Sequence, residues 1–178
     1  EFIKGQNKYC LWISDDLKEL AHNIPIINER INKCRDIRNS SNREATKKLA
    51  IIPHKFAEIR FKNTNAIIMP RVSSERRNYI PTGFLDNTNV ISDSALAIFD
   101  AKEWLLGVLS SNMHMVWVKA ISGYLGTSIR YSATLTYNTF PFPKITQTKK
   151  EKIEELVNII LDERDKEYLK TLAELYDP

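Results

Sequence analysis

The segment 109–143 constrains the fold of this chain more than any other part of the sequence. It begins inside a stretch, 104–121, whose apolar residues recur with the period of a helix. Gly123 and Gly126 then interrupt the pattern, and from 130 to 137 polar and apolar residues alternate as in a half-buried strand. Two prolines end that strand. The segment therefore predicts a buried helix followed by a strand whose polar face begins with an arginine.

The other periodic segments place helices towards both ends of the chain and short strands between them. Helical patterns cover 17–38, interrupted by Pro25, then 43–50, 149–168 and 169–176, with Asn42 and Thr148 as expected caps. Strand patterns cover 9–13, 56–61, 66–69, 79–85 and 90–91, a polar loop covers 73–78, and 94–99 fits either a strand or a helix. This order predicts an α+β fold, in which a small antiparallel sheet is flanked by N-terminal helices, a central buried helix and C-terminal helices.

A length of 178 residues suits one domain with a helical appendage. We expect a domain at 1–147 and a C-terminal helical segment at 148–178, which packs on it or on a domain outside this chain. The abrupt start suggests a piece of a longer protein. No apolar run could span a bilayer and no signal peptide is visible, which favours a cytoplasmic protein without a membrane partner. Cys10 and Cys34 lack a metal-binding spacing, so we expect reduced thiols and no metal site.

The positive charge of the chain is unevenly distributed. Basic residues concentrate between Arg30 and Lys62 and again at 71–77, whereas the tail from Lys149 onward leans acidic. Although the net charge is only +4, this segregation suggests a polyanionic partner for the body of the chain, with a solvated, lysine-rich helix face as the alternative. Arginines with hydroxyls beside them suit phosphate oxygens. The candidate phosphate contacts are Arg43, Lys47, Lys48, Lys55, Arg71, Ser73, Ser74, Arg76 and Arg77.

The sequence carries no recognisable catalytic motif. It has no G-x-G-x-x-G, no P-loop and no nucleophile elbow, and its histidines, His22, His54 and His114, are far apart. One alternative is a Mg²⁺-dependent nuclease fragment that uses Asp93, Asp100 and Lys102, because Asp100 and Lys102 form a D-x-K pair. Another is a protein-interaction module that docks through the acidic C-terminal helices.

Five segments, in their order along the chain, resemble one known family. They are KYCLWI, MPRVSSERRNYIP, LSSNMHMVWVKAISGYL, RYSATLTYNTFPFP and the closing ELYDP. Together they are similar to the target-recognition domain of MmeI-like bifunctional restriction–modification enzymes, over about residues 9–178. The phrases S-S-x-M-H-M-x-W, R-Y-S and Y-N-T-F-P-x-P carry most of this resemblance.

The resemblance implies a DNA-reading domain of a bacterial type II enzyme. Such proteins fuse a nuclease, an adenine-N6 methyltransferase that uses S-adenosylmethionine, and the reading domain. This chain contains no N-P-P-[FYW] tetrapeptide and no cofactor loop. The resemblance therefore implies that the fragment itself is not catalytic and holds no cofactor, while the parent uses S-adenosylmethionine and Mg²⁺. The implied partners are double-stranded DNA and the methyltransferase and nuclease domains of the same parent chain.

The family also implies where base-reading residues lie. One region comes just before R-Y-S, here Gly126 to Arg130, and the other is a turn some tens of residues upstream, here Asn87 to Ser94. An arginine can bridge O6 and N7 of guanine, and serine or threonine can contact several bases. The candidates for base reading are Thr127, Ser128, Arg130, Ser132, Asn89, Ser92 and Asp93.

Overall fold

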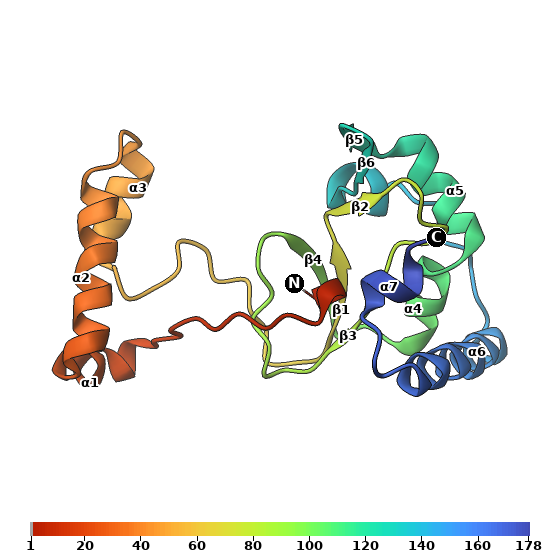
Figure 1. Ribbon diagram of the computed structural model, residues 1–178, viewed down its shortest axis with the longest axis horizontal. Coiled ribbons are helices and arrows are strands. Elements are labelled where there is room, and N and C mark those ends of the chain that lie inside the picture. Colours follow the sequence, from red (N-terminus) through yellow and green to blue (C-terminus); the bar gives the residue numbers. More distant parts are fainter. Residues whose placement is uncertain (1) are drawn as a thin grey trace. The chain divides into compact units, whose positions relative to one another are not determined.

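The computed structural model describes residues 2–178, which form two units (Figure 1). One unit is Lys8–Arg60, and the other combines the described residues before Lys8 with Phe61–Pro178. Helices occur in both units and small antiparallel sheets in the second, which confirms the predicted α+β class.

The unit Lys8–Arg60 is helical. Its helices are α1 (Lys18–Asn23), α2 (Pro25–Asn39) and α3 (Glu44–Lys48), with 3₁₀ turns at Asp15–Leu17 and Leu49–Ile51. Pro25 is the first residue of α2, where a missing N–H removes no helical hydrogen bond, so the predicted interruption separates two helices. The guanidinium of Arg38 donates to the carbonyls of Leu49, Ile52 and Lys55 at 2.8, 2.9 and 2.7 Å. It thereby fastens α2 to the segment that follows α3.

Three predictions for this unit are wrong. Segments 9–13 and 56–61 form no strand, although Trp12 stacks on Phe56 with ring centroids 5.6 Å apart. Neither segment is hydrogen-bonded into a sheet, and Tyr9 is 94% exposed, so β-prone composition alone does not make a strand here. The residue at the cap of α3 is Arg43 and not Asn42, without a side-chain hydrogen bond.

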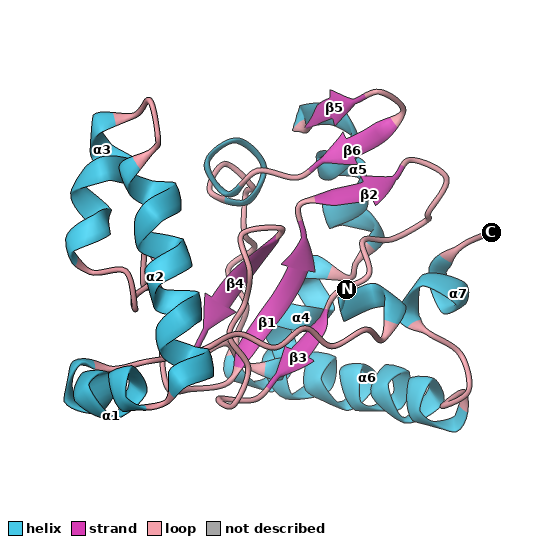
Figure 2. Ribbon diagram, turned by 60° about the vertical axis from the view of Figure 1, so that its left-hand side comes forward, coloured by secondary structure: helices cyan, strands magenta, loops and turns pink. Residues whose placement is uncertain are grey.

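The second unit contains two three-stranded antiparallel sheets, drawn in magenta in Figure 2. In the first, β1 (Ala66–Pro70) lies between β3 (Gly83–Leu85) and β4 (Ala95–Phe99). In the second, the order is β2 (Val72–Ser74), β6 (Ser128–Arg130) and β5 (Gly123–Leu125). The predicted strand at 66–69 is confirmed and 94–99 is a strand. The strand predicted at 79–85 is shorter, the one at 90–91 is absent, and β2 takes up part of the predicted loop 73–78.

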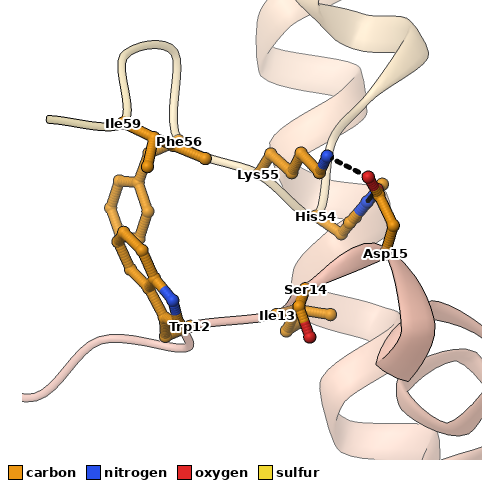
Figure 3. A pocket seen from close by; sticks show the side chains of 8 residues that line it. All are labelled: Trp12, Ile13, Ser14, Asp15, His54, Lys55, Phe56 and Ile59. Atoms are coloured by element: carbon orange, nitrogen blue, oxygen red, sulfur yellow. Dashed lines mark hydrogen bonds and ion pairs between the residues drawn. The ribbon is translucent and has the colours of Figure 1, made fainter. Parts of the chain in front are cut away.

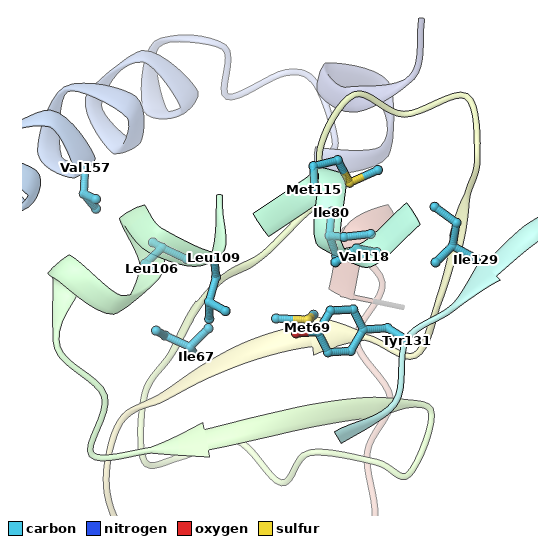
Figure 4. Close-up of a cluster of buried hydrophobic side chains, with 10 residues drawn as sticks. All are labelled: Ile67, Met69, Ile80, Leu106, Leu109, Met115, Val118, Ile129, Tyr131 and Val157. Atoms are coloured by element: carbon cyan, nitrogen blue, oxygen red, sulfur yellow. The ribbon is translucent and has the colours of Figure 1, made fainter. Parts of the chain in front are cut away.

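Four helices complete this unit: α4 (Glu103–Leu109), α5 (Asn112–Ile121), α6 (Gln147–Lys166) and α7 (Leu172–Tyr176). The single helix expected at 104–121 is two helices, because Ser111 caps α5 by accepting from the backbone N–H of His114 at 3.2 Å. Thr146 caps α6 in place of Thr148. Figure 4 shows the main core of the unit, which consists of Ile67, Met69, Ile80, Leu106, Leu109, Met115, Val118, Ile129, Tyr131 and Val157.

The strand predicted at 130–137 ends at Arg130 and is followed by a π-helical turn, Ala133–Tyr137. Ser132 caps this turn by accepting from the N–H of Leu135 at 3.3 Å. The hydroxyl of Thr136, which is fully buried, lies 2.9 Å from that of Ser122. The short polar residues that gave the segment its alternation thus hydrogen-bond locally, which competes with a sheet ladder.

Candidate nucleic-acid interface

The sheet β2–β6–β5 gathers the first predicted base-reading region on one face. Its register pairs Arg130 with Val72 and Gly123 on its two sides, and Ser128 with Ser74 and Leu125. Residues directly opposite one another in an antiparallel sheet point to the same side, as do residues two apart in a strand. We call this side the outer face, and its members are Val72, Ser74, Gly123, Leu125, Ser128 and Arg130.

In β2 and β6, the opposite side of this sheet faces the protein. Ile129 is fully buried and Ser73 is 2% exposed, whereas Arg130 is exposed and Ser128 is half-buried. Within residues 2–178, the guanidinium of Arg130 has no hydrogen-bond or ion-pair partner. A cation that is solvated and unpaired on a β-sheet face can reach a ligand without breaking an existing contact.

The β5–β6 hairpin turns tightly at Gly126 and Thr127. Gly126 has φ of +61°, a left-handed conformation that a residue with a Cβ rarely adopts. No atom lies within 4 Å of the Cβ positions that Gly123 and Gly126 lack, so space above both glycines is open. Thr127 is exposed at this turn. The hairpin therefore presents its end residues to solvent.

A buried histidine anchors the strand from behind. Tyr131 follows Arg130, and its hydroxyl lies 3.0 Å from Nε2 of His114. Nδ1 of His114 lies 2.8 Å from the carbonyl of Leu109; since a carbonyl only accepts, Nδ1 carries the proton and Nε2 accepts from Tyr131. Burial lowers the pKa of His114, which favours this neutral form, and raises the pKa of Tyr131.

The second predicted base-reading region meets the first through Arg71. The backbone N–H of Arg71 donates to Ser94, its carbonyl accepts from Tyr131, and its Nε donates to the carbonyl of Asp93. Ser92 is exposed, with its hydroxyl 2.6 Å from that of Ser94. Segment 92–94 is thus bonded to the residue that precedes β2.

Two more base-reading candidates hold local structure. The amide of Asn89 donates to the carboxylate of Asp86 at 2.8 Å in a turn, where hydrogen bonds led by that from Thr88 lower the pKa of Asp86. Ser132 caps the π-helical turn as described above. Contacts to DNA by these side chains remain predictions.

The two candidates after β2, Arg76 and Arg77, differ sharply in environment. Arg76 is exposed and has no partner in the described part of the chain, while Ser74 accepts from its backbone N–H. Arg77, by contrast, is buried, and its guanidinium donates to Asp177 at 2.6 Å and to Ser73 at 3.3 Å. The sequence ranked these neighbours equally, because the partner Asp177 lies 100 positions away.

The basic candidates in Lys8–Arg60 fall into two groups, those without an ion-pair partner and those with one. Arg43 and Lys48 are exposed, and neither side chain has a partner in the described residues. Lys47 pairs with Glu44 at 2.9 Å, and Lys55 pairs with Asp15. The hydrogen bond from Lys55 is the main reason why the pKa of Asp15 is lowered, and His54 contributes as well.

A pocket of about 200 Å³ lies beside this ion pair (Figure 3). Trp12, Phe56 and Ile59 form its apolar side, and Asp15, His54 and Lys55 form its polar side. Nδ1 of His54 is buried without a partner in the described residues, whereas Nε2 faces Asp15 at 3.2 Å. Sequence patterns gave no sign of this pocket.

The residues of the nuclease alternative, Asp93, Asp100 and Lys102, do not form a metal site among the described residues. Asp100 accepts from the hydroxyl of Thr64 at 2.6 Å, and the backbone of Asp93 holds Arg71. Across residues 2–178, no three His, Cys, Asp or Glu side chains cluster in a way that could hold a metal ion. In the same range, no helix has the length and apolar character needed to cross a membrane.

Comparison with known proteins gives three matches. The family model of the MmeI target recognition domain matches residues 1–144. DNA methyltransferase A of Bacillus subtilis (strain 168) is 45% identical over 178 residues, which is 100% of this chain and 20% of that protein. The solved structure of the Type IIL restriction-modification enzyme MmeI in complex with DNA is 35% identical, with a TM-score of 0.95, over 99% of this chain and 24% of that one. The chain thus spans about a fifth to a quarter of these relatives.

Proposed function

The chain belongs to the family of MmeI target recognition domains, and from this premise we propose that it selects the DNA sequence on which a larger bacterial restriction–modification methyltransferase acts. The outer face of the sheet β2–β6–β5 is the observation that carries this proposal. It combines the unpaired Arg130 with the hydroxyls of Ser74 and Ser128. Gly123 lies opposite Arg130 and has no side chain, so DNA can approach the sheet closely there. A two-stranded ribbon fits the major groove, where base edges differ most.

Arg130 is the central reader in this proposal. Its guanidinium can donate two parallel hydrogen bonds to O6 and N7 of a guanine. Ser128 lies two residues away on the same face, and Thr127 lies at the turn, so both can contact neighbouring bases. Ser132, Asn89, Ser92 and Asp93 complete the proposed set, with the second region bonded to β2 through Arg71.

Phosphate contacts come from cations that have no partner inside the protein. Arg43, Lys48 and Arg76 meet this condition among the described residues. Lys47 and Lys55 are already paired with carboxylates, so contact with phosphate would have to compete with these pairs. Ser74 belongs to the outer face and Arg71 directly precedes β2, so both suit contacts to the backbone of the same duplex, although Nε of Arg71 already donates to the carbonyl of Asp93.

We place methyl transfer and DNA cleavage in the rest of the parent protein. The sequence of this chain offers neither a cofactor loop nor an N-P-P-[FYW] tetrapeptide. S-adenosylmethionine and Mg²⁺ would therefore bind outside it, and a flipped adenine would enter the methyltransferase domain. A restriction–modification system acts on cellular DNA, so we propose a cytoplasmic location.

The exposed apolar surface of Lys8–Arg60 supports contact with those other domains. Among its described residues, the buried hydrophobic side chains are few, namely Ala21, Ile31 and Ala50. Ile26, Ile37 and Ile51 are 65%, 70% and 83% exposed. A unit of this size does not expose so much apolar surface unless something covers it. We propose that the methyltransferase domain or the nuclease domain does so, and that 148–178 supports the reading domain through α6.

Substitution of Arg130 tests the proposal. In the full-length protein, Arg130→Ala should lower discrimination at one base pair of the target by about 1–3 kcal/mol. Arg76→Ala is the matched control, because it should weaken binding to all sequences and reduce the salt slope by about 1. Sequencing of methylated adenines in cells that express each variant reads out sequence choice. If Arg130→Ala methylates the same sequence at the same rate, Arg130 does not read DNA.

The nuclease alternative has a separate test. Plasmid cleavage by this chain in Mg²⁺, lost on Asp100→Ala, would favour it. We expect no cleavage, since Asp93, Asp100 and Lys102 are not part of any cluster of metal ligands in the described residues.

A further inference from the structure

We infer that Arg77 and Asp177 form a brace that positions the DNA-reading sheet, so that the residue directly after α7 controls sequence discrimination without touching DNA. The inference rests on the proposed function, because it assumes that the outer face of β2–β6–β5 reads bases. It assigns Arg77 a different role from that of its neighbour Arg76.

The contacts of Arg77 are specific in geometry. Nε donates to Oδ1 of Asp177 at 2.6 Å, and Nη1 donates to the hydroxyl of Ser73 at 3.3 Å. The side chain of Arg77 is 8% exposed and that of Asp177 is 52% exposed. A planar guanidinium can hold two partners in fixed directions, which a lysine cannot do with the same precision of angle. Arg77 is therefore committed to the protein and unavailable to a phosphate.

Ser73 connects this brace to the reading face. It is the middle residue of β2 and pairs with Ile129 of β6, and both side chains lie on the buried side of the sheet. Its neighbours in β2, Val72 and Ser74, belong to the outer face, where Val72 lies opposite Arg130. β2 is an edge strand of three residues, so few ladder hydrogen bonds fix its position. The hydrogen bond from Arg77 to Ser73 is therefore a large part of the contacts that keep β2 in position.

The other end of the brace is itself fixed. Asp177 directly follows α7, whose first turn is closed by a capping box between Thr171 and Glu174. Arg164 of α6 donates to the carbonyl of Thr82 at 2.8 Å and also to the hydroxyl of Tyr176. Because Tyr176 and Asp177 are adjacent, α6 holds the residue to which Arg77 binds. The brace therefore runs from α6 through Asp177 and Arg77 to β2.

This arrangement predicts opposite phenotypes for two neighbouring arginines. Arg76 is exposed and unpaired, so its loss should reduce affinity for every sequence and flatten the salt dependence. Loss of Arg77 or Asp177 removes no charged side chain that contacts DNA, but it breaks the contact that holds β2 in position. The readers on the outer face then lose their fixed geometry, which lowers the preference for the correct sequence and leaves the salt slope unchanged.

The experiment uses the full-length protein and two DNA duplexes. One duplex carries the sequence that the protein methylates, and the other differs from it at one base pair. Binding to both is measured over a salt series for Arg77→Gln, Asp177→Asn, the double variant and the control Arg76→Gln. We expect each single brace variant to lower the ratio of the two affinities about tenfold. The double variant should lower it no further, because either change alone breaks the same brace. Arg77→Lys should fall between Arg77→Gln and the unchanged protein.

Each other result overturns a defined claim. If the brace variants keep the full affinity ratio, Arg77 and Asp177 do not position the readers. If Arg77→Gln reduces the salt slope as Arg76→Gln does, Arg77 contacts phosphate and the brace is wrong. Asp177→Asn keeps the test valid if Arg77→Gln does not fold, since Asp177 is half exposed. If the unchanged protein shows no sequence preference at all, the proposed function fails, and the inference fails with it.

Discussion

The buried hydrogen bond between Tyr131 and His114, next to β6, offers the most direct energetic test. His114 is fully buried and Tyr131 is 2% exposed, and the tyrosine donates to Nε2 of the histidine at 3.0 Å. Tyr131→Phe keeps the ring and removes the donor, which leaves Nε2 buried and unsatisfied. An unsatisfied buried acceptor costs about 1–3 kcal/mol, so Tyr131→Phe should lower the free energy of unfolding by that amount.

Urea denaturation at pH 8, followed by tryptophan fluorescence, measures this loss. Trp104 and Trp117 belong to the same unit as His114 and report on it. His114→Gln and the double variant complete a double-mutant cycle, which isolates the coupling between the two side chains. A loss below about 0.5 kcal/mol in Tyr131→Phe, or strictly additive single changes, would show that the hydrogen bond does not contribute to stability.

The same site predicts a pH dependence with a defined sign. Burial lowers the pKa of His114 below its ordinary value of about 6.5, so the unfolded chain binds the proton more readily than the folded one. The stabilisation from the neutral histidine is therefore complete above pH 7.5 or so and is lost as the pH falls through about 6.5 towards the folded pKa. In His114→Gln this loss should disappear. The reasoning is refuted if both proteins show the same slope between about pH 5.5 and 7.5.

Three further substitutions test packing and capping. Gly107→Ala should destabilise the protein by about 1–3 kcal/mol in urea denaturation, because a Cβ on α4 would overlap Ile153 of α6; an unchanged stability would mean that α6 can shift. Arg38→Ala removes three hydrogen bonds to carbonyls after α3 and should speed amide exchange there but not in β1. Thr171→Ala opens the capping box of α7 and should cost about 1 kcal/mol by thermal unfolding, whereas Gln147→Ala, outside any cap, should cost less.

The helices were accessible to sequence reasoning because their signals are local. Pro25 marked the division between α1 and α2, and apolar periodicity located α5 and α6. The errors concern caps, where several hydroxyls compete within a few residues. Thr146 caps α6 although the nearby Thr148 is chemically equivalent, and a capping box that was not predicted occurs at Thr171 in α7.

The strands were less accessible because their partners are distant in sequence. β2 pairs with β6 across more than 50 residues, so only the folded chain shows that Ser74 and Ser128 share a face. Segments 9–13 and 56–61 have strand-like composition but pair with no strand. The alternation of polar and apolar residues at 130–137 also failed to predict the local structure. Its alternating hydroxyls can cap a helical turn as well as line a strand, and Ser132 caps one here.

The candidate site shows how burial separates residues that sequence treats alike. Arg76 and Arg77 share charge, type and neighbourhood, yet only Arg77 is buried against a carboxylate. Lys47 and Lys48 are both exposed and differ in pairing instead, because Glu44 forms an ion pair with Lys47 alone. The density of positive charge therefore identified the basic segments. Which of their side chains lack a carboxylate partner could only be seen in the folded structure.

Under the proposed function, affinity and specificity have separate structural sources. The outer face carries one charged side chain, Arg130, beside hydroxyl, apolar and glycine positions. Such a face supplies little of the electrostatic attraction that dominates non-specific DNA binding. That attraction must come from cations elsewhere, of which Arg43, Lys48 and Arg76 are exposed and unpaired in the described residues. It follows that a change on the outer face can alter the sequence selected while most of the binding energy is retained, provided that the strand beneath it stays in position.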